Sequence, residues 1–116
     1  MKYYIGVDGG GTKTRIILTD GNLDIKKTSE LDASNLVTTN SLETINKIHC
    51  KIQEYLREYE VYGIGMGLAG IDTEKDRIKL QKKVSSKYPD ITVRVFNDGI
   101  TSLIGGLNYQ PGILIN

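Results

Sequence analysis

Apolar and polar residues alternate along three short segments at the start of the chain. Residues 2–8 and 14–20 are rich in Ile, Val, Leu, Tyr and Thr and flank three glycines, a pattern that predicts a β-hairpin. A second turn follows, and residues 23–30 then place apolar side chains between polar ones, as on a half-exposed edge strand. The first quarter of the chain therefore predicts a three-stranded antiparallel meander.

The apolar spacing changes to a helical one after a polar loop at residues 31–39. Asn40 or Ser41 can cap this helix, and its apolar positions recur every three or four residues: Leu42, Ile45, Ile48, Ile52, Leu56 and Tyr59. A second helix is capped by Asp72 or Thr73 and ends near Tyr88, because Pro89 follows. Strands are predicted at residues 61–66, 91–96 and 113–115, and a short helix extends through Leu103.

This order of elements brings four unusual segments to one edge of a sheet. After the meander, each strand-helix-strand connection is expected to be right-handed and to place the later strands parallel to the first. The carboxyl ends of those strands carry Asp8 with its glycines, the loop around Asn35, the turn at residues 67–70 and Asp98. Because ligands of open α/β sheets bind at that edge, the sequence predicts a ligand site there.

Composition and charge narrow the class of protein. The 116 residues suffice for one domain, and 15 Lys and Arg against 14 Asp and Glu leave a net charge of +1. This balance gives no field to gather nucleic acid or an anionic membrane, so we expect neither partner. The single cysteine, Cys50, cannot form an internal disulfide, and no stretch is apolar for long enough to span a membrane. We therefore expect a cytoplasmic protein.

The segment Asp8-Gly9-Gly10-Gly11-Thr12-Lys13-Thr14 carries the most specific chemistry in the chain. Three glycines let backbone N–H groups approach a phosphate without obstruction, and the two threonines add hydroxyl donors. Asp8 can hold Mg²⁺ through its water shell. The alternative is a glycine-rich turn that Asp8 merely caps, but a turn needs one or two glycines and not three followed by Thr-Lys-Thr.

Two other phosphate motifs fit less well. A Walker A loop requires Gly-Lys-Ser/Thr, and here Thr12 separates Gly11 from Lys13. Residues 65–70 match the dinucleotide fingerprint Gly-x-Gly-x-x-Gly, but the predicted helix begins only after its third glycine. The acidic residue that this fingerprint expects would fall near Asp90, before a strand and not at its end.

With these motifs, the chain resembles the N-acetylglucosamine kinase-like branch of the BadF/BadG/BcrA/BcrD ATPase family, within the actin, hexokinase and acetate kinase superfamily. The resemblance rests on Asp-Gly-Gly-Gly-Thr-Lys-Thr, on the Gly-Leu-Ala-Gly turn and on Phe96-Asn97-Asp98-Gly99, and it covers essentially the whole chain. It implies an ATP-dependent sugar kinase. The implied fold is a ribonuclease H-like lobe, of the α/β class, with a mixed five-stranded sheet in which an antiparallel meander precedes parallel strands and helices.

The resemblance also implies roles for individual residues. Asp98 would be the catalytic base, with Asp8 as the Mg²⁺ residue. The expected ATP-binding residues are Asp8, Gly10, Gly11, Thr12, Lys13 and Thr14, and the expected sugar-binding residues are Asn35, Ala69, Gly70 and Asn97. Some relatives carry a serine near Ala69, so the identity of the sugar stays open between N-acetylglucosamine, glucosamine and a related hexose.

The family continues beyond the point that corresponds to Asn116 with a second lobe that holds the adenosine. We therefore expect residues 1–110 to form an N-terminal ATPase lobe and residues 111–116 to begin a strand that leads to a missing lobe, with a homodimer as an option. Two alternatives stay open. One is the activator ATPase of a 2-hydroxyacyl-CoA dehydratase system, and the other is a non-catalytic nucleotide-binding module, because Asp98 would also cap a helix well. His49 and Cys50 are interpreted as packing residues of the first helix.

Overall fold

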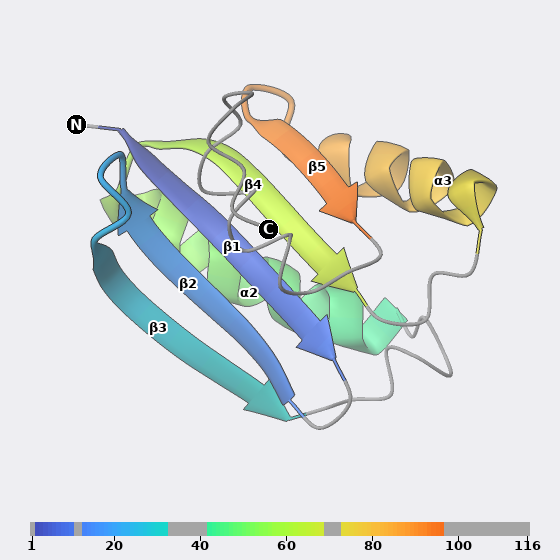
Figure 1. Cartoon of the computed structure of the whole chain (residues 1–116), viewed down its shortest axis with the longest axis horizontal. Helices are drawn as coiled ribbons and strands as arrows, with labels where there is room; N and C mark the ends of the chain where they lie inside the picture. The colour runs from blue at the N-terminus through green and yellow to red at the C-terminus, as the bar shows by residue number, and fades with distance from the viewer. Residues whose placement is uncertain (1, 11–12, 33–41, 69–72, 97–116) are drawn as a thin grey trace.

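The computed structural model describes residues 2–10, 13–32, 42–68 and 73–96. These residues form five strands and two helices (Figure 1), namely β1 (Tyr3–Gly10), β2 (Lys13–Asp20), β3 (Ile25–Asp32), α2 (Leu42–Glu58), β4 (Val61–Leu68), α3 (Glu74–Ser85) and β5 (Thr92–Phe96). Of the loop predicted at residues 31–39, Leu31 and Asp32 instead belong to β3, because they pair with Thr14 and Lys13 of β2. Residues 33–39, the helix through Leu103 and the strand at 113–115 lie outside the described residues.

The five strands form one mixed sheet in the order β3-β2-β1-β4-β5. β1 pairs antiparallel with β2, and β2 pairs antiparallel with β3, so the predicted meander is confirmed. β4 pairs parallel with β1, and β5 pairs parallel with β4. The predicted fold class, an antiparallel meander followed by parallel strands and helices, is therefore observed.

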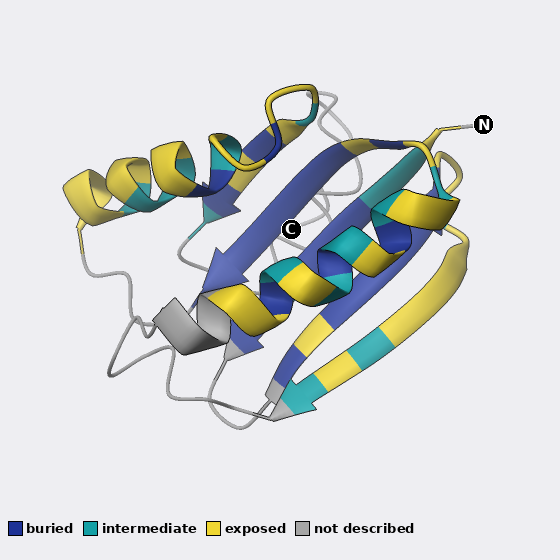
Figure 2. Ribbon diagram, turned by 180° about the vertical axis from the view of Figure 1, so that it is seen from behind, coloured by how far each residue is buried: buried dark blue, intermediate teal, exposed yellow. Residues whose placement is uncertain are grey.

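Both described helices cover the same face of the sheet (Figure 2). The side chains of this face alternate along the strands, and α2 adds Ile48, Ile52 and Tyr55 to them. From the sheet come Ile5, Val7, Ile16, Leu18, Ile64, Met66, Leu68, Val93 and Val95, all of them buried. On the opposite face of the sheet, Gly6 of β1 pairs with Gly65 of β4. The apolar core therefore lies between the sheet and its two helices.

The turn between β2 and β3 explains why β3 begins at Ile25 and not at Leu23, as predicted. The Asp20 carboxylate oxygen Oδ1 accepts hydrogen bonds from the backbone N–H groups of Asn22 at 2.8 Å and Asp24 at 3.1 Å. Leu23 has a φ of 68°, in the left-handed region, and its N–H donates to the Asp20 carbonyl at 3.1 Å. Asp20 thus organises a turn that takes up the residues before Ile25.

Strand β4 is longer than the sequence indicated. The predicted strand ended at Met66 and gave way to a glycine-rich turn, whereas β4 continues through Gly67 and Leu68, which pair with Asp8 and Gly9 of β1. From Gly63 onward, glycines alternate with large apolar residues in β4, so Ile64, Met66 and Leu68 all face the helices. The period of two outweighs the turn preference of the glycines.

The two helix boundaries of α3 differ in how well they were predicted. Thr73 is the N-cap, as expected, and its hydroxyl oxygen accepts from the Asp76 N–H at 3.1 Å. The helix ends at Ser85 and not near Tyr88, and the backbone N–H of Ser86 closes it onto the Lys82 carbonyl. A further turn, from the Tyr88 N–H to the Ser85 carbonyl, leads to Pro89.

Candidate functional site

The carboxyl ends of four strands meet at one edge of the sheet, as predicted. The pairing register joins Asp32 of β3 to Lys13 of β2, and Lys13 to Gly10 of β1. On the other side of β1, Gly9 pairs with Leu68. Farther along, Gly67 pairs with Phe96, the last residue of β5 (Figure 1). β1, β3, β4 and β5 therefore all terminate along this edge, which we call the strand-end rim.

Asp8 lies within β1, two residues before its end, and is half-buried. Its register partners are Arg15 on β2 and Gly67 on β4. Because Val7 belongs to the core under α2, Asp8 faces the opposite side of the sheet. Gly67 has no side chain to cover this carboxylate from the β4 side, so the space beside it is left to a ligand or to another segment.

Arg15 adds positive charge to the same face of the sheet. Its guanidinium forms an ion pair with the Glu30 carboxylate on β3 at 3.5 Å, between side chains that are 53% and 43% exposed. Such an exposed pair contributes little to stability. Its effect is to set a cation between two carboxylates, because Glu30, Arg15 and Asp8 are consecutive register partners across three strands.

The glycine-rich segment forms the connection between β1 and β2. Gly10 pairs with Lys13, so only Gly11 and Thr12 separate the two strands. The register places Gly10 on the same face as Asp8, whereas Thr14, the partner of Gly9, lies on the helix-covered face and is 1% exposed. The segment predicted to bind phosphate is thus divided between the two faces, and the Thr14 hydroxyl is buried.

The remaining predicted site residues lie outside the described part of the chain. These are Gly11, Thr12, Asn35, Ala69, Gly70, Asn97 and Asp98. The described strands nevertheless fix where several of them leave the sheet: Ala69 follows Leu68 directly, and Asn97 follows Phe96 directly. Both exits are on the strand-end rim, and the roles of these residues stay predictions.

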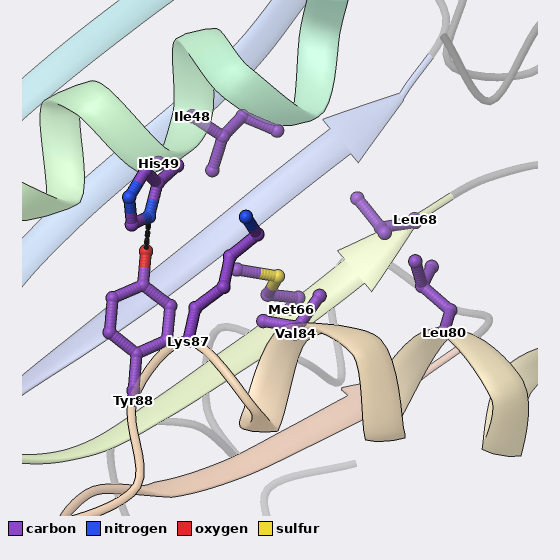
Figure 3. Close-up of a pocket in the computed structure, with 8 residues that line it drawn as sticks. All are labelled: Ile48, His49, Met66, Leu68, Leu80, Val84, Lys87 and Tyr88. Atoms are coloured by element: carbon purple, nitrogen blue, oxygen red, sulfur yellow. Dashed lines mark hydrogen bonds between the residues drawn. The ribbon is translucent and has the colours of Figure 1, made fainter. Parts of the chain in front are cut away.

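A small apolar pocket lies between α2 and α3, on the helix-covered face (Figure 3). Met66 and Leu68 of β4 form its floor, and Lys87 and Tyr88 stand at one side. The remaining lining residues are Ile48, His49, Leu80 and Val84. Since Asp8 faces the other side of the sheet, this pocket is separate from the strand-end rim.

His49 and Tyr88 pair with each other beside this pocket. The His49 Nδ1 and the Tyr88 hydroxyl are 2.5 Å apart, and the ring centroids are 5.4 Å apart. Burial lowers the pKa of His49, and the nearby Lys87 ammonium lowers it further, while burial raises the pKa of Tyr88 to about 12. This contact agrees with the interpretation of His49 as a packing residue, whereas Cys50 on the same helix is exposed, so its interpretation as a packing residue is wrong.

Two negative findings concern the described residues alone. Among residues 2–10, 13–32, 42–68 and 73–96, no three His, Cys, Asp or Glu side chains gather as a metal-ligand group. No helix in the same ranges is long and apolar enough to cross a membrane.

Comparison with known proteins gives the family. The model of the ROK family matches residues 4–97, which is most of the chain. The chain belongs to the ROK family. ROK proteins fall within the actin-like ATPase superfamily, so the predicted superfamily is confirmed, whereas the BadF/BadG/BcrA/BcrD branch is not confirmed and stays a prediction.

Two curated relatives of this ROK chain are named as kinases. The chain is 30% identical over 122 residues to an N-acetylmuramic acid/N-acetylglucosamine kinase of Clostridium acetobutylicum, and 29% identical over 116 residues to an N-acetyl-D-glucosamine kinase of Dictyostelium discoideum. The matches cover 99% and 89% of this chain. The chain spans 39% of the first relative and 36% of the second.

Solved structures share the fold of this ROK chain. A candidate sugar kinase from Cytophaga hutchinsonii matches with a TM-score of 0.61 at 18% identity, over 80% of this chain and 35% of that one. A ROK family transcriptional regulator, a homologue of the E. coli MLC protein, matches with a TM-score of 0.63 at 14% identity, over 81% and 27%. At these identities the likeness shows the fold alone.

Proposed function

We propose that these residues form the nucleotide- and sugar-binding lobe of an ATP-dependent sugar kinase that acts on N-acetylglucosamine or a related amino sugar. The observation that carries the proposal is the strand-end rim of a ROK chain, where the glycine-rich connection, Asp8 and the exits to Ala69 and Asn97 come together. The names of the two curated relatives support this substrate class. They do not favour the activator ATPase alternative.

In this proposal the rim residues divide into three groups. Gly10, Gly11, Thr12 and Lys13 bind the phosphates of ATP, and Asn35, Ala69, Gly70 and Asn97 bind the sugar. Asp98 is the base that orients a sugar hydroxyl and accepts its proton. Thr14 pairs with Gly9 and is 1% exposed, and its predicted part in ATP binding stays a prediction beside those of the other glycine-rich residues.

The residues present fit ATP and Mg²⁺. Gly9 and Gly10 leave the end of β1 free of side chains, which lets backbone N–H groups approach a phosphate. Asp8 offers an oxygen ligand on the same face, and Mg²⁺ beside phosphates is usually held by one or two carboxylates together with water. When bound, the ion would neutralise charge on the transferred phosphoryl group.

The fraction of its relatives' length that the chain spans supports a second lobe. Because the chain spans 39% and 36% of the two curated kinases, we propose that the adenosine pocket is supplied by a second lobe, beyond a boundary near residue 110. The proposed partners are then a small-molecule sugar and this lobe, with a homodimer as an option and with neither nucleic acid nor membrane.

The test uses the complete product of the gene that encodes these residues. Asp98→Asn keeps the size of the side chain and removes the base, so it is expected to lower kcat for N-acetylglucosamine by about a hundredfold to ten-thousandfold with little change in the sugar KM. Asp90→Asn, at an exposed site beyond Pro89, is the matched control and should keep wild-type kcat. A wild-type protein that phosphorylates no amino sugar would overturn the proposed function.

A further inference from the structure

The outer edge of β5 is held by side chains of α3. β5 stands last in the described sheet, so its backbone groups on one side face away from β4. There the Val95 N–H donates to Gln81 Oε1 at 2.9 Å, and Arg77 Nη1 donates to the Val95 carbonyl oxygen at 3.1 Å. In the described sheet, two side chains thus form the hydrogen bonds with the Val95 backbone that a neighbouring strand would otherwise form.

The two side chains are themselves joined. Arg77 and Gln81 lie four residues apart on one face of α3, and Arg77 Nη1 also donates to Gln81 Oε1 at 3.2 Å. Because both groups that approach Gln81 are donors, its amide must present the oxygen and not the nitrogen. Glu74 completes the network, since its Oε1 accepts from Arg77 Nε at 2.7 Å and also from Nη2.

The charges in this network hold the arginine in place. The hydrogen bond from Arg77 lowers the pKa of Glu74, and the same bond raises the pKa of Arg77 above its already high ordinary value. Both groups therefore stay ionised at neutral pH. The start of α3 is fixed as well, because Thr73 caps the helix on the turn that carries Glu74. The position of the Arg77 fork relative to β5 is thus set from the first turn of the helix.

Val95 comes three positions before Asp98, the residue proposed as the base. The Val95 side chain is 0% exposed, Phe96 ends the strand, and Asp98 follows two residues later. We propose that Gln81 and Arg77 are positioning residues that fix the end of β5, and through it the place of Asp98 at the strand-end rim. This inference rests on the proposed function, because it assigns the network a task in that reaction.

Placement of this kind matters in a kinase because phosphoryl transfer depends mainly on the position of the reacting groups. A displacement of about 1 Å can cost on the order of a hundredfold in rate. The network binds the backbone at the outer edge of β5, and none of its side chains is among those proposed to bind phosphate or sugar. Its loss should therefore lower kcat and leave the two KM values nearly unchanged.

Three variants of the complete gene product separate the steps. Gln81→Met keeps the length and helix preference of the side chain but removes the acceptor for the Val95 N–H. Gln81→Glu keeps an acceptor oxygen beside Arg77 and is the rescue variant. Lys79→Met makes the same loss of polarity at an exposed position of α3 and is the control.

The measurements are amide hydrogen exchange at Val95, and kcat and KM for N-acetylglucosamine and ATP, taken well below the melting temperature. We expect Gln81→Met to speed exchange at Val95 by about tenfold or more and to lower kcat by about tenfold or more, with both KM values within about twofold of wild type. Gln81→Glu and Lys79→Met should retain wild-type exchange and kcat.

Each other outcome overturns a defined step. Unchanged exchange at Val95 in Gln81→Met overturns the anchoring itself. Faster exchange with unchanged kcat overturns the positioning role and leaves the proposed function intact. A fall in kcat that Gln81→Glu shares, although it keeps Val95 protected, overturns the assignment to the acceptor oxygen. A wild-type protein without amino sugar kinase activity removes the proposed function and the positioning role together, whatever the exchange at Val95 shows.

Discussion

The contact between His49 and Tyr88 predicts how the stability of the chain changes with pH. His49 is the single histidine of the sequence, so proton uptake by imidazole between pH 5.5 and 7 has one source. Burial raises the pKa of Tyr88 to about 12, so its hydroxyl keeps the proton in this pH range, and it forms a hydrogen bond of 2.5 Å with Nδ1 of the His49 ring. The charged groups that act on the ring are known: the Lys87 ammonium adds to the effect of burial and lowers the pKa of His49.

The sign and the size of the effect follow from this shift. In the unfolded chain the pKa of His49 returns to about 6.5, above its folded value, so the unfolded state binds the proton first as pH falls. The contribution is therefore fully present above about pH 6.5 and is lost as pH falls toward the folded pKa. With one group titrating, the free energy of unfolding can fall by no more than about 1.4 kcal/mol per pH unit in this window. Removal of the hydroxyl in Tyr88→Phe should separately cost about 1 kcal/mol, because the His49 ring loses its partner.

The assay is urea unfolding between pH 5 and 8, together with an NMR titration of the His49 ring. Wild type should lose stability below pH 6.5, His49→Gln should show a flat profile above pH 5.5, and Lys87→Met should move the ring pKa back toward 6.5. The exposed residue Lys83 provides the control, since Lys83→Met removes a charge on α3 that does not act on the ring. A slope that persists in His49→Gln, or a ring pKa above 6.5 in wild type, would refute the reasoning.

Three further predictions concern single side chains. Thr19 is 0% exposed and its hydroxyl has no hydrogen-bond partner among the described residues, so Thr19→Val should raise the free energy of unfolding by about 1 kcal/mol in urea denaturation, and a loss would contradict this. Ile52→Ala on the buried face of α2 should lower it by about 2–5 kcal/mol, whereas Gln53→Ala beside it should change it by less than about 0.5 kcal/mol. In the complete kinase, Asn35→Ala should raise the sugar KM far more than the ATP KM, and equal changes in steady-state kinetics would remove its assignment.

Periodicity predicted most of the fold because the core is built from side chains that repeat along each element. The helical spacing of Ile48 and Ile52 corresponds to the face of α2 that is buried on the sheet. The alternation along β1 and β2 likewise marks the residues under that helix. Where a glycine interrupts a pattern, periodicity and turn preference disagree, and the extension of β4 to Leu68 shows that the buried side chains decide the outcome.

The sequence predicted which edge of the sheet carries the candidate site, but not which face of the sheet each side chain lies on. The order of strands alone brings the ends of β1, β4 and β5 to one edge. Which threonine of the glycine-rich segment can reach a ligand depends on the register between β1 and β2, because a shift of one residue moves each side chain to the other face. The pairing of Gly9 with Thr14 buries that hydroxyl, a result that depends on the length of the connection and not on residue type.

The hydrogen-bond network at Val95 could not be predicted from the sequence, for a different reason. From the sequence, Gln81 and Arg77 are expected on the solvent-exposed side of a helix. Their spacing does not distinguish them from Lys79 or Lys82. Their partner is a backbone group, which every residue has, and it needs a partner only because β5 lies at the edge of the described sheet. Whether such a polar side chain binds the strand backbone is determined by the order of the strands and by the rotation of the helix beside them. It follows that residues which fix a strand end by binding its backbone are found from the structure, even where the residue that they position is evident from the sequence.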